Sequence, residues 1–302
     1  MYPLCFGEFL LNYSERLHTA TLDMISTGFS QIADQKLFEL VKLYWLIGGL
    51  PEAVEAFLTR KKNLRDGLLA CREVHLQLIN GYTSDFAKHC GGLNAQHINL
   101  VFHNIPSQLQ KIRDGSSKRY HFSGIAPNRS KYSQLSGPIE WLANSGLALK
   151  FNQLSKIERP LKSYSVENFF RLFLFDTGLL SSMLEVEKGD LLSTKHYSYK
   201  GFIAENFIAQ ELRFFEIPSY SFNENRSEVE FVLDYSGHTI PVEVKSGTNL
   251  KSKSLSSFKQ RYEPKTAVKF SGRPLRHEAG QISIPLYLSS FLKDILKQAL
   301  EQ

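Results

Sequence analysis

The sequence predicts an α+β protein of several parts, with helices in its first half and an α/β region at its end. The chain has 302 residues, which favours two or three domains over one small core. Apolar residues recur at three- and four-residue steps up to about residue 93, whereas segments of alternating apolar residues follow residue 199. Hydrophobic residues make up 42% and charged residues 22%, as in ordinary globular proteins.

Residues 1–93 are predicted to form helices. One helix opens near Asp34 and stops at Gly48-Gly49, and Pro51 suits the first position of the next helix. A longer helix is expected over residues 63–89, with His75 on its buried stripe. At that position we expect a hydrogen-bonded core histidine rather than a catalytic one.

Residues 94–152 are predicted to form a winged-helix-like unit. A helix is expected from Asn94, a second from Pro106, a short strand over residues 119–122, a third helix from near Arg129 and Lys131, and a strand over 147–151. This order is typical of a winged helix-turn-helix, with the third helix recognising DNA. A compact helical unit that packs on its neighbours and touches no DNA is an equal alternative.

Residues 153–198 are predicted to connect the two halves. Residues 169–175 indicate a buried strand, and Asp176 follows it directly. We expect Asp176 to cap the next helix through its side-chain oxygen rather than bind a metal.

From residue 199 onward the pattern is α/β. A helix is expected over residues 200–215, followed by a hairpin of two strands, 227–234 and 239–245, around a glycine-containing turn. A helix (255–262), two strands (266–270 and 282–288) and a closing helix (290–300) complete this predicted domain, residues 199–302.

Acidic and basic residues lie on successive predicted elements in an order that is typical of phosphodiester hydrolysis. Glu205 lies on the first helix, Glu230 on the first hairpin strand, and Glu243 and Lys245 share one face of the second. Clustered carboxylates bind Mg²⁺ through hard oxygen ligands, and the metal stabilises a phosphoryl transition state. The three glutamates are therefore candidate metal ligands, and all four residues are candidate catalytic groups. The ordinary meaning of Glu-Val-Lys is an edge strand with an ion pair, and that alternative stays open.

Two stretches carry most of the positive charge. Residues 94–152 hold 7 basic and 2 acidic side chains, and residues 241–302 hold 11 and 5. We expect weak, sequence-indifferent DNA binding through Lys251, Lys253, Lys259 and Arg261, with Arg129 and Lys131 as a second site. Solvated surface charge is the alternative reading.

The remaining features concern location. The 3 cysteines have no metal-ligand or redox spacing, which fits a reducing compartment. No apolar run reaches the length of a membrane span, and the first ten residues do not resemble a signal peptide. We expect a cytoplasmic protein without a membrane partner.

Several segments in order resemble one known family. They are residues 2–10 (YPLCFGEFL), 48–54 (GGLPEAV), 85–89 (DFAKH), 174–180 (LFDTGLL), 199–207 (YKGFIAENF), 227–231 (SEVEF) and 240–247 (IPVEVKSG). Together they resemble the domain of unknown function that follows the ATPase module in bacterial and archaeal AAA-like ATPases. This resemblance covers nearly the whole chain. It implies a winged-helix-like middle and a C-terminal domain with the PD-(D/E)XK, or restriction-endonuclease-like, fold.

The chain departs from that family in two respects. It has no Gly-x-x-x-x-Gly-Lys-Ser/Thr motif, so we expect no ATP binding, and the ATPase module is expected to be truncated, split off or lost. Glu230 stands where the family usually has aspartate, and its extra methylene alters metal geometry.

Three functions remain open from the sequence. The chain is an ATPase-associated binding module linked to nucleic acid, a Mg²⁺-dependent nuclease, or an inactive scaffold for protein contacts. An ATPase chain or another protein is a candidate partner. The nuclease requires the four side chains to converge in a cleft, whereas the scaffold requires them to pair with each other or with Lys200 and Arg226.

Overall fold

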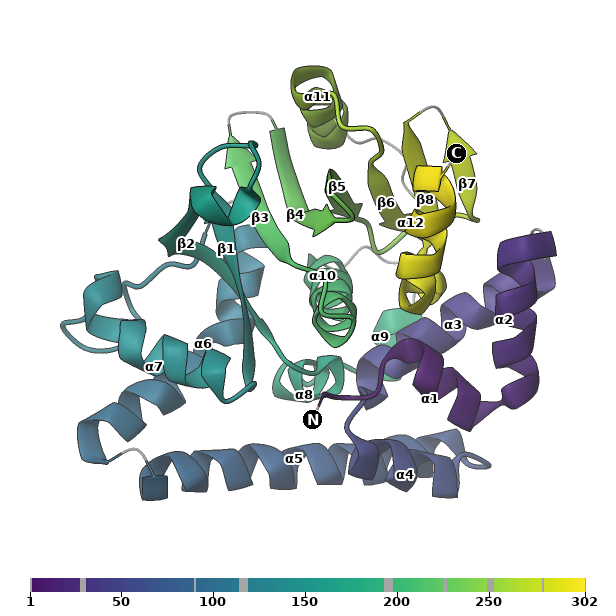
Figure 1. Ribbon diagram of the computed structural model, residues 1–302. Helices are drawn as coiled ribbons and strands as arrows, with labels where there is room; N and C mark the ends of the chain where they lie inside the picture. Colours follow the sequence, from purple (N-terminus) through teal and green to yellow (C-terminus); the bar gives the residue numbers. More distant parts are fainter. Residues whose placement is uncertain are drawn as a thin grey trace.

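A computed structural model describes residues 2–27, 31–89, 91–113, 119–192, 198–224, 227–248, 253–278 and 280–301. Its centre is a mixed sheet of eight strands in the order β2-β1-β3-β4-β5-β6-β8-β7 (Figure 1). The strands are β1 (Ala148–Leu154), β2 (Ser165–Leu174), β3 (Ser219–Glu224), β4 (Ser227–Tyr235), β5 (His238–Val244), β6 (Val268–Ser271), β7 (Arg276–Glu278) and β8 (Gln281–Pro285).

Twelve α-helices are described alongside this sheet. They are α1 (Phe6–Tyr13), α2 (Glu15–Thr27), α3 (Gln31–Ile47), α4 (Pro51–Arg60), α5 (Leu64–His89), α6 (Gly92–Arg113), α7 (Tyr132–Asn144), α8 (Thr177–Met183), α9 (Lys188–Leu192), α10 (Ser198–Phe214), α11 (Lys253–Tyr262) and α12 (Leu292–Glu301). Two 3-10 helices, η1 (Leu161–Tyr164) and η2 (Leu286–Phe291), join them. In Figure 1, α5 and α4 run along one side of the molecule, and α10 lies between that side and the sheet.

Helices α10 and α11 cover opposite faces of the sheet. Phe231 and Leu233 of β4 belong to the large apolar cluster that includes α10. Val232 belongs instead to a second cluster with Leu255 and Phe258 of α11. The period-2 alternation of a strand therefore gives each face its own helix.

The hairpin of β4 and β5 confirms the sequence prediction. Its strands pair antiparallel from Phe231↔Val242 to Tyr235↔His238. Ser236 (φ 47) and Gly237 (φ 79) form the turn, and both have the left-handed backbone that tight two-residue hairpin turns require.

Local signals also predicted most of the helices. Helix α3 ends at Ile47, before Gly48, and Pro51 begins α4. His75 is fully buried on α5, with Nδ1 2.8 Å from the Ser182 hydroxyl and Nε2 3.0 Å from the Ile47 carbonyl. The prediction of a hydrogen-bonded core histidine is confirmed. Burial lowers its pKa to about 4, so the imidazole is neutral at physiological pH.

The middle of the chain differs from the prediction in three ways. Pro106 does not begin a helix, because α6 continues through it, and the buried Phe102, Ile105 and Leu109 hold that helix in place. Residues 119–122 form no strand. Their backbone forms isolated hydrogen bonds rather than a strand ladder, for example from the Tyr120 N–H to the Phe170 carbonyl at 2.9 Å. Helix α7 begins at Tyr132, so Arg129 and Lys131 precede it rather than lie on it.

The sheet also crosses the predicted domain boundaries. Strands β1 and β2, from the predicted middle and connecting segments, form one edge of the sheet that contains the hairpin. The contact is made through β3, which pairs with β4 along its length and with β1 at Gln153↔Ser221. The winged-helix and endonuclease folds stay predictions.

No helix in the described part of the chain is long and apolar enough to cross a membrane.

Candidate functional site

The hairpin positions three of the four predicted site residues. The pair Phe231↔Val242 is the last one recorded along the ladder, and one step beyond it lie Glu230 on β4 and Glu243 on β5. Lys245 follows β5 by one residue, and its backbone N–H donates to the Phe270 carbonyl at 2.9 Å. The structure therefore brings together the three hairpin residues that the sequence singled out.

Glu205 of α10 is the fourth predicted site residue, and it is already paired with a basic side chain. Its carboxylate forms a salt bridge with the guanidinium of Arg171 on β2. The two side chains are only 3% and 6% exposed, so this is a buried ion pair. Such a pair costs desolvation, which is offset only while both charges stay paired.

Lys245 occupies the space between the other two carboxylates. Its Nζ atom lies 2.6 Å from Oε1 of Glu243 and 4.0 Å from Oε1 of Glu230. Lys269 of β6 stands directly opposite Glu243 in the parallel ladder of β5 and β6, and it is 1% exposed. Burial lowers the pKa of Lys269, while Glu243 acts to raise it. Three acidic and three basic side chains therefore share this cluster, which we call the charge cluster: Arg171, Glu205, Glu230, Glu243, Lys245 and Lys269.

The environment of Glu230 disfavours its charged form. Burial raises its pKa, the neighbouring charge of Glu205 raises it further, and Lys245 opposes the rise. Its Oε2 atom accepts a hydrogen bond from the Val244 N–H at 3.2 Å.

The fit of the cluster to a metal ion is incomplete. Among the residues that the structure describes, no group of three or more His, Cys, Asp or Glu side chains is arranged to hold a metal. Arg171 already forms a salt bridge with Glu205, and Lys245 lies 2.6 Å from Glu243. One observation points the other way, because Oε2 of Glu243 is buried and has no hydrogen-bond partner. As arranged, the residues do not form a metal site, although one oxygen atom is available for a further contact.

The predicted DNA-binding residues lie on separate parts of the fold. Lys253 and Arg261 are exposed on α11 and Lys259 is half-buried there, while Lys251 lies outside the described residues. The guanidinium of Arg261 is 3.0 Å from the Glu224 carboxylate. Arg129 is half-buried and Lys131 exposed, both before α7.

Two basic members of the charge cluster were missed from the sequence. Arg171 lies within an otherwise apolar strand and Lys269 between valine and phenylalanine. A charge inside an apolar strand is the only local signal of a buried partner, and it does not name that partner. The predicted partner Lys200 instead interacts electrostatically with Lys42 and Asp190. Burial lowers the pKa of Lys200, Lys42 lowers it further and Asp190 opposes the change. Arg226 is outside the described residues.

A second polar arrangement ties the helices to each other. Asp176 caps α8 through the Leu179 N–H at 2.9 Å, which confirms the predicted cap, and it also accepts the Gly49 N–H at 2.7 Å. Glu211 of α10 accepts hydrogen bonds from the Phe6 N–H at 2.8 Å and from the Ser290 hydroxyl at 2.7 Å. Burial raises the pKa of Asp176 to about 6 and that of Glu211 to about 7. These two carboxylates hold distant segments of the chain together, and neither forms a salt bridge with a described residue.

Comparisons with known proteins found two family models. Residues 38–190 match a model described as domain of unknown function (DUF8612), and residues 200–288 match one described as domain of unknown function (DUF4143). The charge cluster draws Arg171 from the first region and its other members from the second. No curated protein and no solved structure matches the chain.

Proposed function

The chain belongs to the family described as domain of unknown function (DUF8612), whose model spans half of it. We propose that it acts as a binding module linked to nucleic acid rather than as a nuclease. The observation that carries this proposal is the pairing inside the charge cluster. Glu205 is paired with Arg171, and Glu243 and Glu230 lie beside Lys245. A carboxylate set that is already neutralised has little remaining attraction for a divalent cation.

Support for a nucleic-acid partner comes from the charge of the C-terminal region. Helix α11 presents Lys253 and Lys259, and Lys265 and Arg273 follow it. Only Glu263 and Glu278 oppose them between residues 253 and 278. Contacts of this kind reach phosphate oxygens and release counterions, so they provide affinity without reading sequence.

The resemblance to ATPase-associated domains supports an ATPase chain as the protein partner. The sequence has no phosphate-binding loop, so the chain itself is expected not to bind ATP. Calorimetry tests this directly, and saturable binding of ATP at micromolar affinity would contradict it.

A gel-retardation assay with a random duplex tests the nucleic-acid proposal. We expect binding at about 50 mM salt that weakens steeply by about 200 mM. The double substitution Lys253→Glu and Lys259→Glu should weaken binding and reduce the salt dependence, whereas Lys62→Glu in the exposed turn after α4 should change neither. Absence of binding at 50 mM salt, or an equal effect of Lys62→Glu, would leave the charge as surface solvation.

A Mg²⁺-dependent nuclease is the second candidate, and one unpaired carboxylate oxygen favours it. The buried Oε2 of Glu243 lacks a hydrogen-bond partner, and it belongs to the glutamate that the sequence pattern places at the centre of the site. Glu205, Glu230 and Glu243 would hold the metal, and Lys245 would stand beside it. Metal binding on this proposal requires the contact between Lys245 and Glu243 to open.

Melting curves separate the two candidates. Wild type and Glu243→Gln are each heated with and without Mn²⁺, because a metal that binds only the folded chain raises its melting temperature. The binding-module proposal predicts no metal-dependent shift in either protein. A shift in wild type that Glu243→Gln abolishes would favour the nuclease, and a plasmid-nicking assay would then measure cleavage. Absence of both a metal shift and DNA binding would leave the scaffold for protein contacts.

A further inference from the structure

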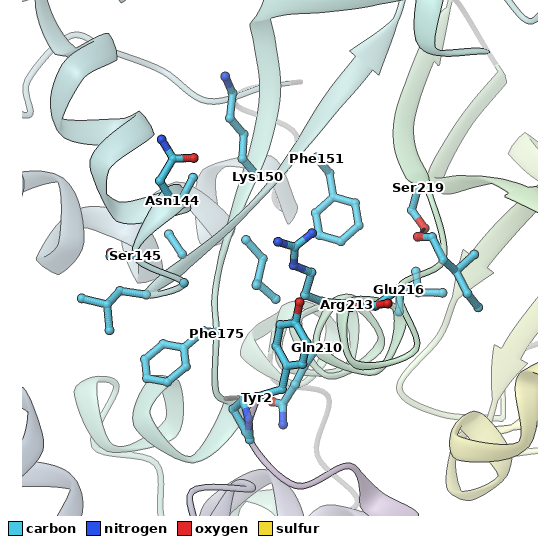
Figure 2. Close-up of a pocket in the computed structure, with 18 of the residues that line it drawn as sticks. Tyr2, Asn144, Ser145, Lys150, Phe151, Phe175, Gln210, Arg213, Glu216 and Ser219 are labelled. Carbon is cyan, nitrogen blue, oxygen red and sulfur yellow. Dashed lines mark hydrogen bonds between the residues drawn. The ribbon is translucent and has the colours of Figure 1, made fainter. Parts of the chain in front are cut away.

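A large groove in the described part of the chain is lined by none of the six residues of the charge cluster. It has a volume of about 1060 Å³ and is bordered by the end of α7, by β1, by the last turn of α10 and by the start of β3. Figure 2 shows Asn144 and Lys150 on one side, Ser219 on the other, and Arg213 between them. Small-molecule sites usually have about 300–1,000 Å³, so this groove is large enough for a short extended peptide.

One wall of the groove is a strand edge with little pairing. Residues Ala148–Leu154 of β1 pair with β2. On the other side, Gln153 pairs with Ser221 of β3, and the Ser221 hydroxyl donates to the Phe151 carbonyl at 3.5 Å, whereas residues 148–150 have no described sheet partner there. The stretch 148–152 lines the groove instead. Its unpaired part, residues 148–150, spans about 10 Å at roughly 3.3 Å per residue, which matches about three residues of an added strand.

The sequence before β3 explains why the ladder stops there. Glu216 has the left-handed backbone (φ 52), and Pro218 has no N–H to donate. These two residues turn the chain out of α10 just where it would otherwise continue beside β1. The gap between β1 and β3 is therefore built into the chain by residues that cannot continue a ladder.

Polar groups in the groove favour a partner that offers both backbone N–H donors and a negative charge. Oδ1 of Asn152 is buried, lacks a hydrogen-bond partner and belongs to the groove lining. Arg213 is exposed, and its recorded contact is with the ring of Tyr2, whose centroid is 5.9 Å away. Its guanidinium extends toward β1 in Figure 2. The other cation, Lys150, already forms a salt bridge with Glu140, so Arg213 is the group available to a carboxylate.

We propose that this groove binds an extended peptide segment of a partner protein, which adds to the edge of β1 and places a carboxylate on Arg213. Backbone hydrogen bonds to an exposed strand edge give affinity, and the side-chain pockets beside it give selectivity. Tyr2, Tyr82 and Leu147 provide accessible apolar surface for alternate side chains. The partner is thus a segment with alternating apolar residues and one acidic position.

Selection from a displayed library of random twelve-residue peptides on the full chain tests this inference. The enriched peptides are expected to share an acidic position, and the best one is synthesised and measured by fluorescence anisotropy. Arg213→Glu should weaken its binding at least tenfold, and replacing the peptide's acidic residue by lysine should restore affinity for that variant. Lys62→Glu serves as the matched control and should leave binding unchanged.

Two further measurements locate the peptide. Hydrogen exchange should slow in residues 147–153 when the peptide binds. N-methylation of alternate peptide amides should abolish binding in one of the two possible sets, because only one set faces β1. Failure to enrich any acidic motif, equal affinity of Arg213→Glu, protection elsewhere, or insensitivity to both N-methylated sets would each overturn the inference.

Discussion

Removal of Arg171 is the most direct test of the charge cluster. Arg171→Met keeps an apolar side chain at this position but removes the guanidinium, which lies 5.0 Å from the Phe173 ring centroid and forms the salt bridge with Glu205. Glu205 is then a carboxylate with a side chain 3% exposed. Breaking a buried ion pair by removing one partner costs about 3–5 kcal/mol, because the remaining charge is not solvated.

The double variant Arg171→Met with Glu205→Gln isolates the pair. Without the buried negative charge, the loss should fall to roughly 1–2 kcal/mol, so the two substitutions should be strongly non-additive. Urea unfolding followed by the fluorescence of Trp45 and Trp141 measures both losses. Trp45 is 1% exposed and reports on the α3 side of the core.

A small effect would refute this reasoning. If Arg171→Met costs less than about 1 kcal/mol, Glu205 is neutralised or solvated in another way. If the double variant loses the sum of the single losses, the two side chains are energetically independent. Recovery of Arg171→Met by Mn²⁺ would instead show that a metal can replace the guanidinium, which would support the nuclease proposal.

Further predictions concern two glycines and one buried carboxylate. Gly48→Ala should destabilise the chain by several kcal/mol, because the new Cβ would lie 2.2 Å from Oδ1 of Asp176 at a left-handed position (φ +71). Gly81→Ala, in the middle of α5 with open space around it, should stabilise it by about 1 kcal/mol in the same urea assay. The pKa of Glu211 is raised to about 7 in the folded chain, against about 4.3 when unfolded. Its stabilising contribution is therefore complete below about pH 4.3 and is lost as the pH rises through about 7. Glu211→Gln, which resembles the protonated form, should remove this loss. The melting temperature of the variant minus that of wild type should therefore increase between pH 5 and pH 8. A constant difference between the two curves would show that Glu211 does not titrate in that range.

Local features of the sequence determined much of the secondary structure. Two residues with left-handed backbone, Ser236 and Gly237, set the hairpin, and its register brought Glu230 beside Glu243 as expected. Gly48 and Pro51 marked the boundary between α3 and α4, and Asp176 capped α8. These features depend on hydrogen bonds and backbone preferences within a few residues, so the sequence alone contains their cause.

The tertiary structure alone decided how the charges are paired. Arg171 and Glu205 are 34 positions apart, and Asp176 and Gly49 are 127 apart. Periodicity tells which face of a strand or helix is buried, but not which element that face will meet. Strand β3 joined the hairpin to β1 and β2 across two predicted boundaries, and this placed Arg171 against α10. The sequence thus singled out the three glutamates and Lys245, whereas the packing of distant strands brought Arg171 and Lys269 to them and left part of the edge of β1 unpaired.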